Sequence, residues 1–165
     1  MTIRGTLGLA VVFVVLAGYL IATRPVVDAL PDASPRLTPP LSRATTIELT
    51  GGDHAPIRLA RSADGPWVES LVPDVLEGLA SLHVLAVVDA APTTPERYGF
   101  APDAPRLRVA EGTTDLVAIE VGAMNPAETG VYVRRGADPS VLLVGALLRW
   151  ELEKLRRVVS TTSQP

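Results

Sequence analysis

The chain of 165 residues contains no cysteine, which excludes a disulfide framework, a thiol nucleophile and a cysteine-based metal site. Histidine is almost as scarce: His54 and His83 are the only two, and their separation matches no metal-ligand spacing. Nucleophile-elbow, phosphate-loop and zinc-protease motifs are also missing. Three serines lack a partner in the sequence apart from a chance approach of His83: Ser70, Ser81 and Ser140. We therefore expect no enzyme, with no catalytic residue, no cofactor and no metal.

A concentration of positive charge is missing as well. The formal net charge is −3, and the basic residues are not gathered in one segment. Because nucleic-acid binding depends on massed Lys and Arg, the composition disfavours a nucleic-acid partner.

The one long hydrophobic run lies at the N-terminus. Residues 5–23 carry no charge, and Arg4 and Arg24 bracket them. A helix of this length spans about 28 Å, close to the ~30 Å hydrocarbon core of a bilayer. The alternative is a cleaved signal peptide, but the residues before Thr23 make a poor cleavage site. The run therefore predicts an uncleaved transmembrane helix at 5–23.

The flanks of this run suggest an orientation in the cell membrane. The N-terminal amine and Arg4 favour a cytoplasmic stub at residues 1–4, so a single-pass protein would hold its domain outside the cytoplasm. Five prolines then fall within residues 24–43, which predicts a semi-rigid, extended spacer. The alternative for this stretch is a loop packed onto the domain.

From residue 44 onward, short alternating runs predict β-strands. Two of them, 45–50 and 56–62, flank the turn dipeptide Gly51-Gly52 and indicate a hairpin. A third short strand is expected at 66–70, and the apolar run 85–90 has the character of a buried strand. Four further strands separated by turn residues predict a meander: 106–110, 116–122, 130–135 and 140–145.

Two segments change to a helical period. Residues 72–85 place leucines at helical spacing behind Pro73, although Gly78 weakens this helix slightly. Residues 146–159 carry one apolar stripe, made of Leu148, Leu152, Leu155 and Val159. Glu153 is expected to pair with Arg156 or Arg157. The fold class is therefore α+β, an antiparallel sheet with two helices over residues 44–159, followed by a disordered tail at 160–165.

The stretch ERYGFAPDAPRLRV, residues 96–109, contains the most distinctive local pattern. Thr94 and Pro95 suit the start of a short helical turn, and Gly99 suits the left-handed residue that ends one. Phe100 is expected to fold back as a hydrophobic contact. The pattern predicts a structural turn of Tyr98, Gly99 and Phe100 that delivers a strand; the alternative is a ligand platform made of the two aromatic rings.

The order of these parts resembles the DUF4340 domain family. The residues that carry the resemblance are Asp64, Gly65 and Trp67; Tyr98, Gly99 and Phe100; Ile119 and Gly122; and Tyr132, Val133 and Arg134. It covers roughly residues 45–157. The resemblance implies a single-anchor membrane protein without assigned catalytic residues, of a kind often encoded beside ABC transporters of the gliding-motility type. Longer members continue past the last helix, whereas this chain ends at Pro165.

Two functions follow as expectations. The first is a non-enzymatic, membrane-anchored accessory or interaction protein, associated with the lipid bilayer and with a protein partner, such as an ABC-type transport system. Arg149, Trp150 and Arg157 are the predicted partner contacts, because Trp and Arg most often carry interface energy. The second is a membrane-tethered binding module for an envelope glycan, lipid or peptide.

The remaining polar and aromatic candidates have simpler interpretations. Glu120 and Glu128 are expected to be solvated separately, not paired across their loop. An anion site at Arg134-Arg135 is a less favoured alternative to solvation at a strand end. Trp67 is expected to cap the core.

Overall fold

The structure, a computed structural model, describes residues 34–62 and 65–162. The predicted stub 1–4, the predicted transmembrane helix 5–23 and the first ten residues of the spacer lie outside this described part. Among the described residues, no helix is long and apolar enough to cross a membrane. The elements are β1 Thr46–Thr50, β2 Ile57–Ala60, α2 Val72–Ala80, β3 Val84–Asp89, the 3₁₀ turn η1 Pro95–Tyr98, β4 Arg106–Glu111, β5 Thr114–Met124, β6 Gly130–Arg135, β7 Val141–Gly145 and α3 Leu147–Thr162.

A seven-stranded antiparallel sheet forms the frame of the domain. Its strand order is β2-β1-β4-β5-β6-β7-β3, so β2 and β3 are the two edges. The hairpin β1–β2 pairs Glu48 with Arg58, and the meander β4 to β7 runs in sequence order. These features confirm the expected α+β class, the hairpin and the meander.

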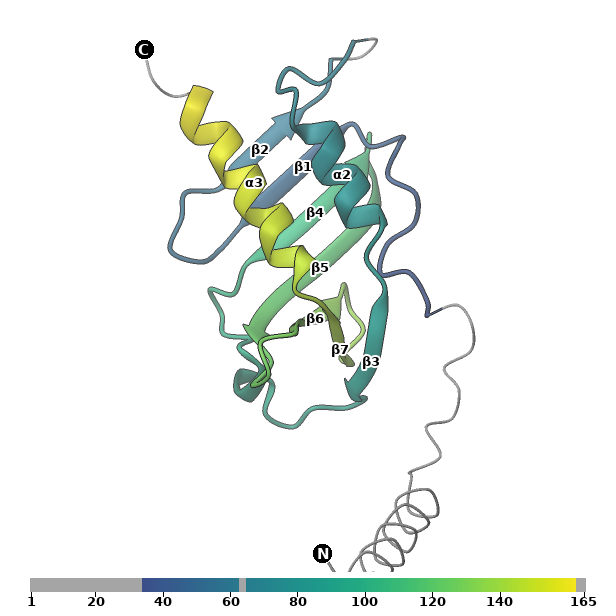
Figure 1. Ribbon diagram of the computed structural model, residues 1–165, viewed down its shortest axis with the longest axis vertical. Coiled ribbons are helices and arrows are strands. Elements are labelled where there is room, and N and C mark those ends of the chain that lie inside the picture. Colours follow the sequence, from purple (N-terminus) through teal and green to yellow (C-terminus); the bar gives the residue numbers. More distant parts are fainter. Residues whose placement is uncertain (1–33, 63–64, 163–165) are drawn as a thin grey trace, which may run out of the picture. The chain divides into compact units, whose positions relative to one another are not determined.

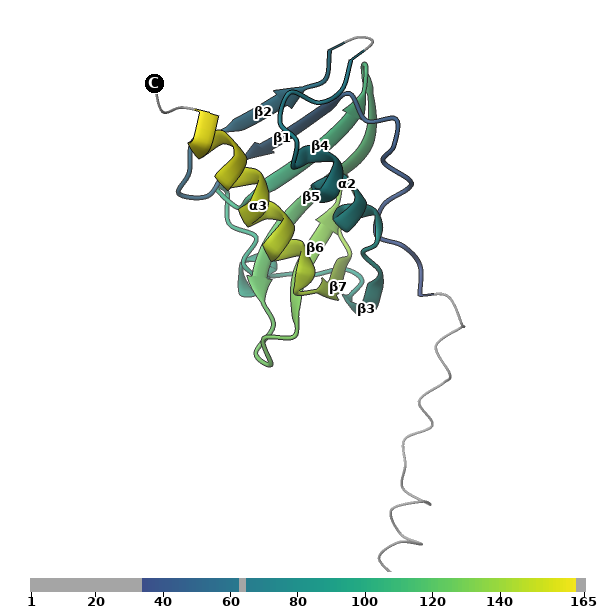
Figure 2. The same cartoon turned by 45° about the horizontal axis from the view of Figure 1, so that its top comes forward.

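Both helices lie over one face of the sheet (Figure 1; Figure 2). Because side chains alternate along a strand, every second residue points toward the helices. The α3 stripe meets this face, with Leu148, Leu152 and Leu155 buried as predicted, whereas the side chain of Val159 lies outside the described part. The core thus lies between the helix layer and the sheet.

The two helices approach each other closely at Gly78. A Cβ atom there would lie 2.4 Å from the carboxyl carbon of Glu151, which is 2% exposed. This carboxylate accepts hydrogen bonds from Nζ of Lys154 at 2.9 and 3.1 Å. Gly78 therefore makes room for a buried, paired glutamate between α2 and α3, which explains a residue that is unfavourable in a helix.

Three local predictions are wrong. Residues 66–70 form no strand; they make bends that lead into α2, with Val68 75% exposed, because no strand lies beside them to pair with. The helix expected at 72–85 ends at Ala80, after which Leu82 is buried and the chain turns into β3. Strand β3 is not buried, since its position at the sheet edge leaves Leu85 and Val87 44% and 63% exposed.

The boundaries of the domain also differ from the prediction. Residues 34–43 do not form a free spacer: Leu37 and Leu41 are buried, and Thr38 donates to the carbonyl of Leu79 at 3.3 Å. The packed-loop alternative therefore holds for this half of the predicted spacer, and the compact unit begins at Ser34. At the other end, α3 continues to Thr162, so residues 160–162 are helical where a disordered tail was expected.

Candidate functional site

The three predicted contact residues lie on one exposed side of α3. Trp150 is 62% exposed, because two positions after Leu148 a helix has turned by about 200° away from the buried stripe. Arg149 precedes it in the chain and Arg157 lies about two helical turns farther along, and both are exposed. The structure thus brings together the three residues that spacing alone had grouped.

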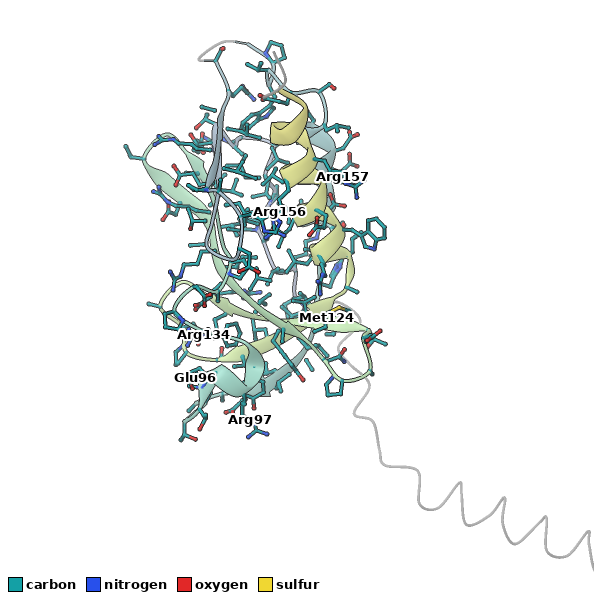
Figure 3. All side chains as sticks on the ribbon, turned by 90° about the vertical axis from the view of Figure 1, so that its left-hand side faces the viewer. Glu96, Arg97, Met124, Arg134, Arg156 and Arg157 are labelled. Carbon is teal, nitrogen blue, oxygen red and sulfur yellow. The ribbon has the colours of Figure 1, made fainter. Side chains whose placement is uncertain are left out.

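A shallow hollow of about 400 Å³ lies beside this tryptophan, and for brevity it is called the Trp150 hollow. Its lining residues are Met124, Ala146, Arg149, Trp150, Glu153 and Arg157. Figure 3 shows Met124 beside the first turn of α3 and Arg157 farther along the same helix. Met124 is the last residue of β5, and the sequence offered no signal that it would meet α3.

A second, smaller hollow of about 180 Å³ continues from the first one. The two share Met124, Arg149 and Glu153, and the smaller one extends to Pro105 and Arg156. Glu153 accepts a hydrogen bond from Nη1 of Arg156 at 2.9 Å, which is one of the two predicted pairings. The flank of α3 therefore offers an adaptable apolar floor with a mainly basic rim, a combination found at interaction surfaces.

Another hollow, of about 430 Å³, is lined by one side of α2 and by the segment 36–42, beside Trp67. Its apolar lining includes Leu41, Leu76 and Ala80, and its charged lining includes Arg61. Trp67 is half-buried and packs against the core, as expected. A concave apolar surface with a few charged groups is a general feature of small-ligand sites.

The stretch 95–100 forms the predicted capped turn. Gly99 adopts the left-handed conformation, with φ +83°, and its amide donates to the carbonyl of Glu96 at 2.9 Å. Thr94 stands at the N-cap position and Pro95 at the first helical position, as predicted, although the Thr94 side chain makes no capping hydrogen bond. Tyr98 and Phe100 are buried, at 8% and 4% exposure, which removes the ligand-platform alternative.

Tyr98 anchors a small second core on the face of the sheet away from the helices. Its ring meets that of Tyr132 edge-on, with the centroids 5.2 Å apart, and Phe100 and Val141 complete the cluster. The Tyr98 hydroxyl donates to Oδ2 of Asp89 at 3.0 Å. Burial, and then this hydrogen bond, raise the pKa of the Tyr98 phenol above its ordinary value.

Arg134 links this cluster to the charged part of the same face. Its guanidinium lies 4.6 Å from the Phe100 ring centroid and pairs with Glu120. Figure 3 shows Arg134 on the side of the sheet away from α3. Arg106 shares the same carboxylate, at 3.3 Å. The anion-site and solvation interpretations of Arg134 are therefore both replaced by a structural role, and Glu120 is not an isolated surface carboxylate.

A second row of ion pairs crosses the same face. Arg58 and Arg108 both contact Glu48, at 3.2 and 3.5 Å, and Arg108 also contacts Asp115 at 2.6 Å. These pairs raise the pKa of Arg108, with the hydrogen bond to Asp115 as the main cause. An open hollow of about 280 Å³ lies between the rows, and its charged lining residues, Glu48, Arg106, Arg108 and Glu120, are already engaged in these contacts. We assign this face to solvation and cross-strand pairing.

The described residues contain no group of three or more His, Asp or Glu side chains placed to hold a metal ion. Of the three serines considered in the sequence as nucleophiles, Ser81 donates a hydrogen bond to the carbonyl of Gly78 at 2.7 Å, which is a contact at the end of α2. His83 lies beside Arg36 in an isolated β-bridge.

The fold and its surfaces define a single α+β domain whose two helices cover one face of an antiparallel sheet, with exposed Trp and Arg residues on the last helix. The family model described as Domain of unknown function (DUF4340) matches residues 58–161. The chain therefore belongs to the DUF4340 family. No curated protein and no solved structure matches it. The matched range begins within β2, although β1, which precedes it, lies between β2 and β4 in the sheet.

Proposed function

We propose that the protein is a non-enzymatic, membrane-anchored interaction protein that serves as an accessory component of a membrane complex, such as an ABC-type transporter. The observation that carries this proposal is the exposure of Trp150, at 62%, beside a hollow flanked by Arg149 and Arg157. Exposure of a large aromatic side chain to water is unfavourable, and a binding partner that covers the side chain removes this cost. Trp and Arg also contribute most of the binding energy at protein interfaces.

The proposed anchor is the uncharged segment 5–23, with the N-terminus in the cytoplasm and the domain outside. An anchor and a compact domain suit a protein that presents a surface near a membrane. The sequence supplies no catalytic motif that would argue for chemistry instead.

One experiment tests both parts. Membranes carrying the tagged full-length protein are washed with alkaline carbonate, solubilised in mild detergent and used for affinity purification. We expect the protein to remain in the washed membranes and to recover a membrane partner. Trp150→Ala should weaken this association at least tenfold, because an interface tryptophan typically contributes ~2 kcal/mol or more.

Leu71→Ala is the matched control, since Leu71 is also a large exposed apolar residue, at 47%, but lies at the start of α2. Both variants should melt within a few degrees of the wild type, because neither side chain is buried. Recovery of no membrane partner by the wild type, or equal losses for the two variants, would count against the proposal.

The hollow beside Trp67 favours a second candidate, a membrane-tethered module that binds an envelope glycan, lipid or peptide. In a Trp150→Phe background, Trp67 is the only tryptophan, so its fluorescence reports on this hollow alone. Titration with phosphatidylglycerol vesicles or peptidoglycan fragments would change that fluorescence if the binding function is correct. An interaction through the Trp150 hollow would leave it unchanged.

A further inference from the structure

The free edge of β3 is apolar along most of its length. The strand pairs with β7 on one side and ends the sheet on the other. Two register irregularities break the usual alternation, and Leu85, Val87 and Val88 are 44%, 63% and 39% exposed. In Figure 1, β3 continues from below α2 into a region that neither helix covers. Natural sheet edges are usually blunted by charge or proline, and residues 84–88 contain neither.

The beginning of this edge already accepts an antiparallel strand. Arg36 pairs with His83, the Leu37 amide donates to the Leu82 carbonyl at 2.8 Å, and the Val84 amide donates to the Pro35 carbonyl at 2.9 Å. The ladder stops there, because proline has no amide hydrogen to return. The backbone of β3 can therefore take an antiparallel neighbour on the side away from β7, and on that side residues 85–89 have none among the described residues.

The opposite edge of the sheet is different. Strand β2 has only four residues, and its outward-facing Arg58 is paired with Glu48. A short strand with a charged face resists pairing with another sheet. The domain thus has one protected edge and one unprotected edge.

We infer that β3 is a self-association surface, at which the free edges of two copies of this chain pair antiparallel about a two-fold axis near Val87 and Val88. Antiparallel pairing of one strand with its own copy is automatically two-fold symmetric, so the valine on the axis, Val87 or Val88, meets its own copy. No like charges oppose each other at the centre, because Asp89 is the only ionisable residue of β3 and is held by Tyr98 and the Ala91 amide.

The same arrangement limits the assembly to two copies. Once two β3 edges have paired, only the two β2 edges remain free, and these are the protected ones. About five residues from each copy form a small contact, well below the ~1,000 Å² of a stable interface. We therefore expect a weak, reversible dimer, for which covalent trapping is the suitable measurement.

The absence of cysteine makes the test specific, because one introduced cysteine is the only thiol in the chain. Val87→Cys and Val88→Cys are each made in the full-length protein and exposed to a mild oxidant at several protein concentrations. Cβ atoms of directly opposed residues in an antiparallel pair lie about 4.5–5.5 Å apart, near the separation that a disulfide requires. Val68→Cys is the matched control, since Val68 is also an exposed valine, at 75%, but lies away from this edge.

We expect at least one β3 variant to form a disulfide-linked dimer at least tenfold faster than Val68→Cys. Adding Leu85→Lys, which places a charge on the edge, should slow this cross-linking to the control rate while leaving the melting temperature nearly unchanged. Cross-linking of both β3 variants at the control rate would overturn the inference. So would exclusive cross-linking to a protein of another mass, because the occupant of the edge would then be a different partner.

Discussion

Replacing Gly99 with alanine tests whether the Tyr-Gly-Phe turn is a packing unit. Two separate costs are expected. The first is conformational: an alanine held at φ +83° loses about 1 kcal/mol relative to glycine. The second is steric, because the new Cβ would lie 2.4 Å from the backbone nitrogen of Ala123 and 2.8 Å from its Cβ. Neither of these atoms belongs to the end of a flexible side chain, so the turn must lift from β5.

The size of the steric cost follows from what lies beneath the turn. Tyr98 and Phe100 are almost completely buried, and complete burial of an aromatic ring is worth roughly 2–3 kcal/mol. If lifting exposes half of each ring, it costs about 2–3 kcal/mol in addition to the conformational term. We therefore expect Gly99→Ala to lower the free energy of unfolding by about 3–4 kcal/mol.

Gly112→Ala is the matched control for this experiment. Gly112 also has a positive φ, +58°, but a Cβ atom there would meet nothing within 4 Å. Gly112→Ala should therefore lower the free energy of unfolding by the conformational cost alone, about 1 kcal/mol. Urea unfolding of the purified proteins, with the slope of the transition compared as well as its midpoint, gives both values. Equal losses for the two variants would refute the steric argument.

Two further predictions concern buried polar groups. Burial and the hydrogen bond to Asp89 raise the pKa of the Tyr98 phenol above 10.0 in the folded protein. The unfolded chain therefore loses this proton at a lower pH than the folded protein does. The free energy of unfolding consequently falls as the pH rises from about 10 through the folded pKa. Tyr98→Phe should flatten the alkaline loss of unfolding free energy measured between about pH 9 and 11; an unchanged slope would contradict this. Gly78→Ala should lower the free energy of unfolding by about 1–2 kcal/mol, despite the better helix propensity of alanine, because it displaces the buried carboxylate of Glu151; greater stability in urea would contradict this.

The strands and helices were predictable because their signals are local. The hairpin at Gly51-Gly52, the meander and the stripe at Leu148, Leu152 and Leu155 depend on residue spacing and turn chemistry alone, and all are confirmed. The left-handed Gly99 was predictable for the same reason.

The errors concern tertiary neighbours. An apolar run such as 85–90 indicates a strand, but only the position at the end of the sheet determines that Val87 is exposed. The prolines of 34–43 indicate extended backbone, but they do not reveal that Leu37 and Leu41 pack against the domain. Glu151 did leave a signal, because it falls on the same helical face as Leu148 and Leu155, where a charged residue must be paired.

The residues of the candidate site that lie on α3 could be predicted from the sequence, whereas the residue contributed by the sheet could not. The spacing of Arg149, Trp150 and Arg157 places them on one side of any helix, so their grouping follows from the period of 3.6 residues. Met124 joins them from the end of β5, a contact that depends on how α3 lies against the sheet. The Arg134–Glu120 pair was missed for a related reason, because it needs the register of β5 with β6.

The residues that carry the family resemblance explain the fold and not the function. Gly99 lets the turn lie on β5, and Gly122 makes room for it, since a Cβ there would be 2.2 Å from the carbonyl oxygen of Tyr98. Tyr132 packs against Tyr98, and Arg134 lies over Phe100. One cluster thus fixes η1 against the sheet, and it draws residues from three of the motifs: the Tyr-Gly-Phe turn, Gly122, and the strand that carries Tyr132 and Arg134.

The two surfaces proposed to bind other chains are formed by other residues than the family motifs. The Trp150 hollow and the β3 edge contain none of the motif residues in their linings, and both present large exposed side chains, Trp150 in the first and Leu85 and Val87 in the second. A chain can therefore keep every motif, and with it this fold, while its exposed α3 residues and its β3 edge vary independently. The partner of this chain therefore has to be established from the residues exposed on its own α3 and β3, because its membership of the family accounts for the scaffold alone.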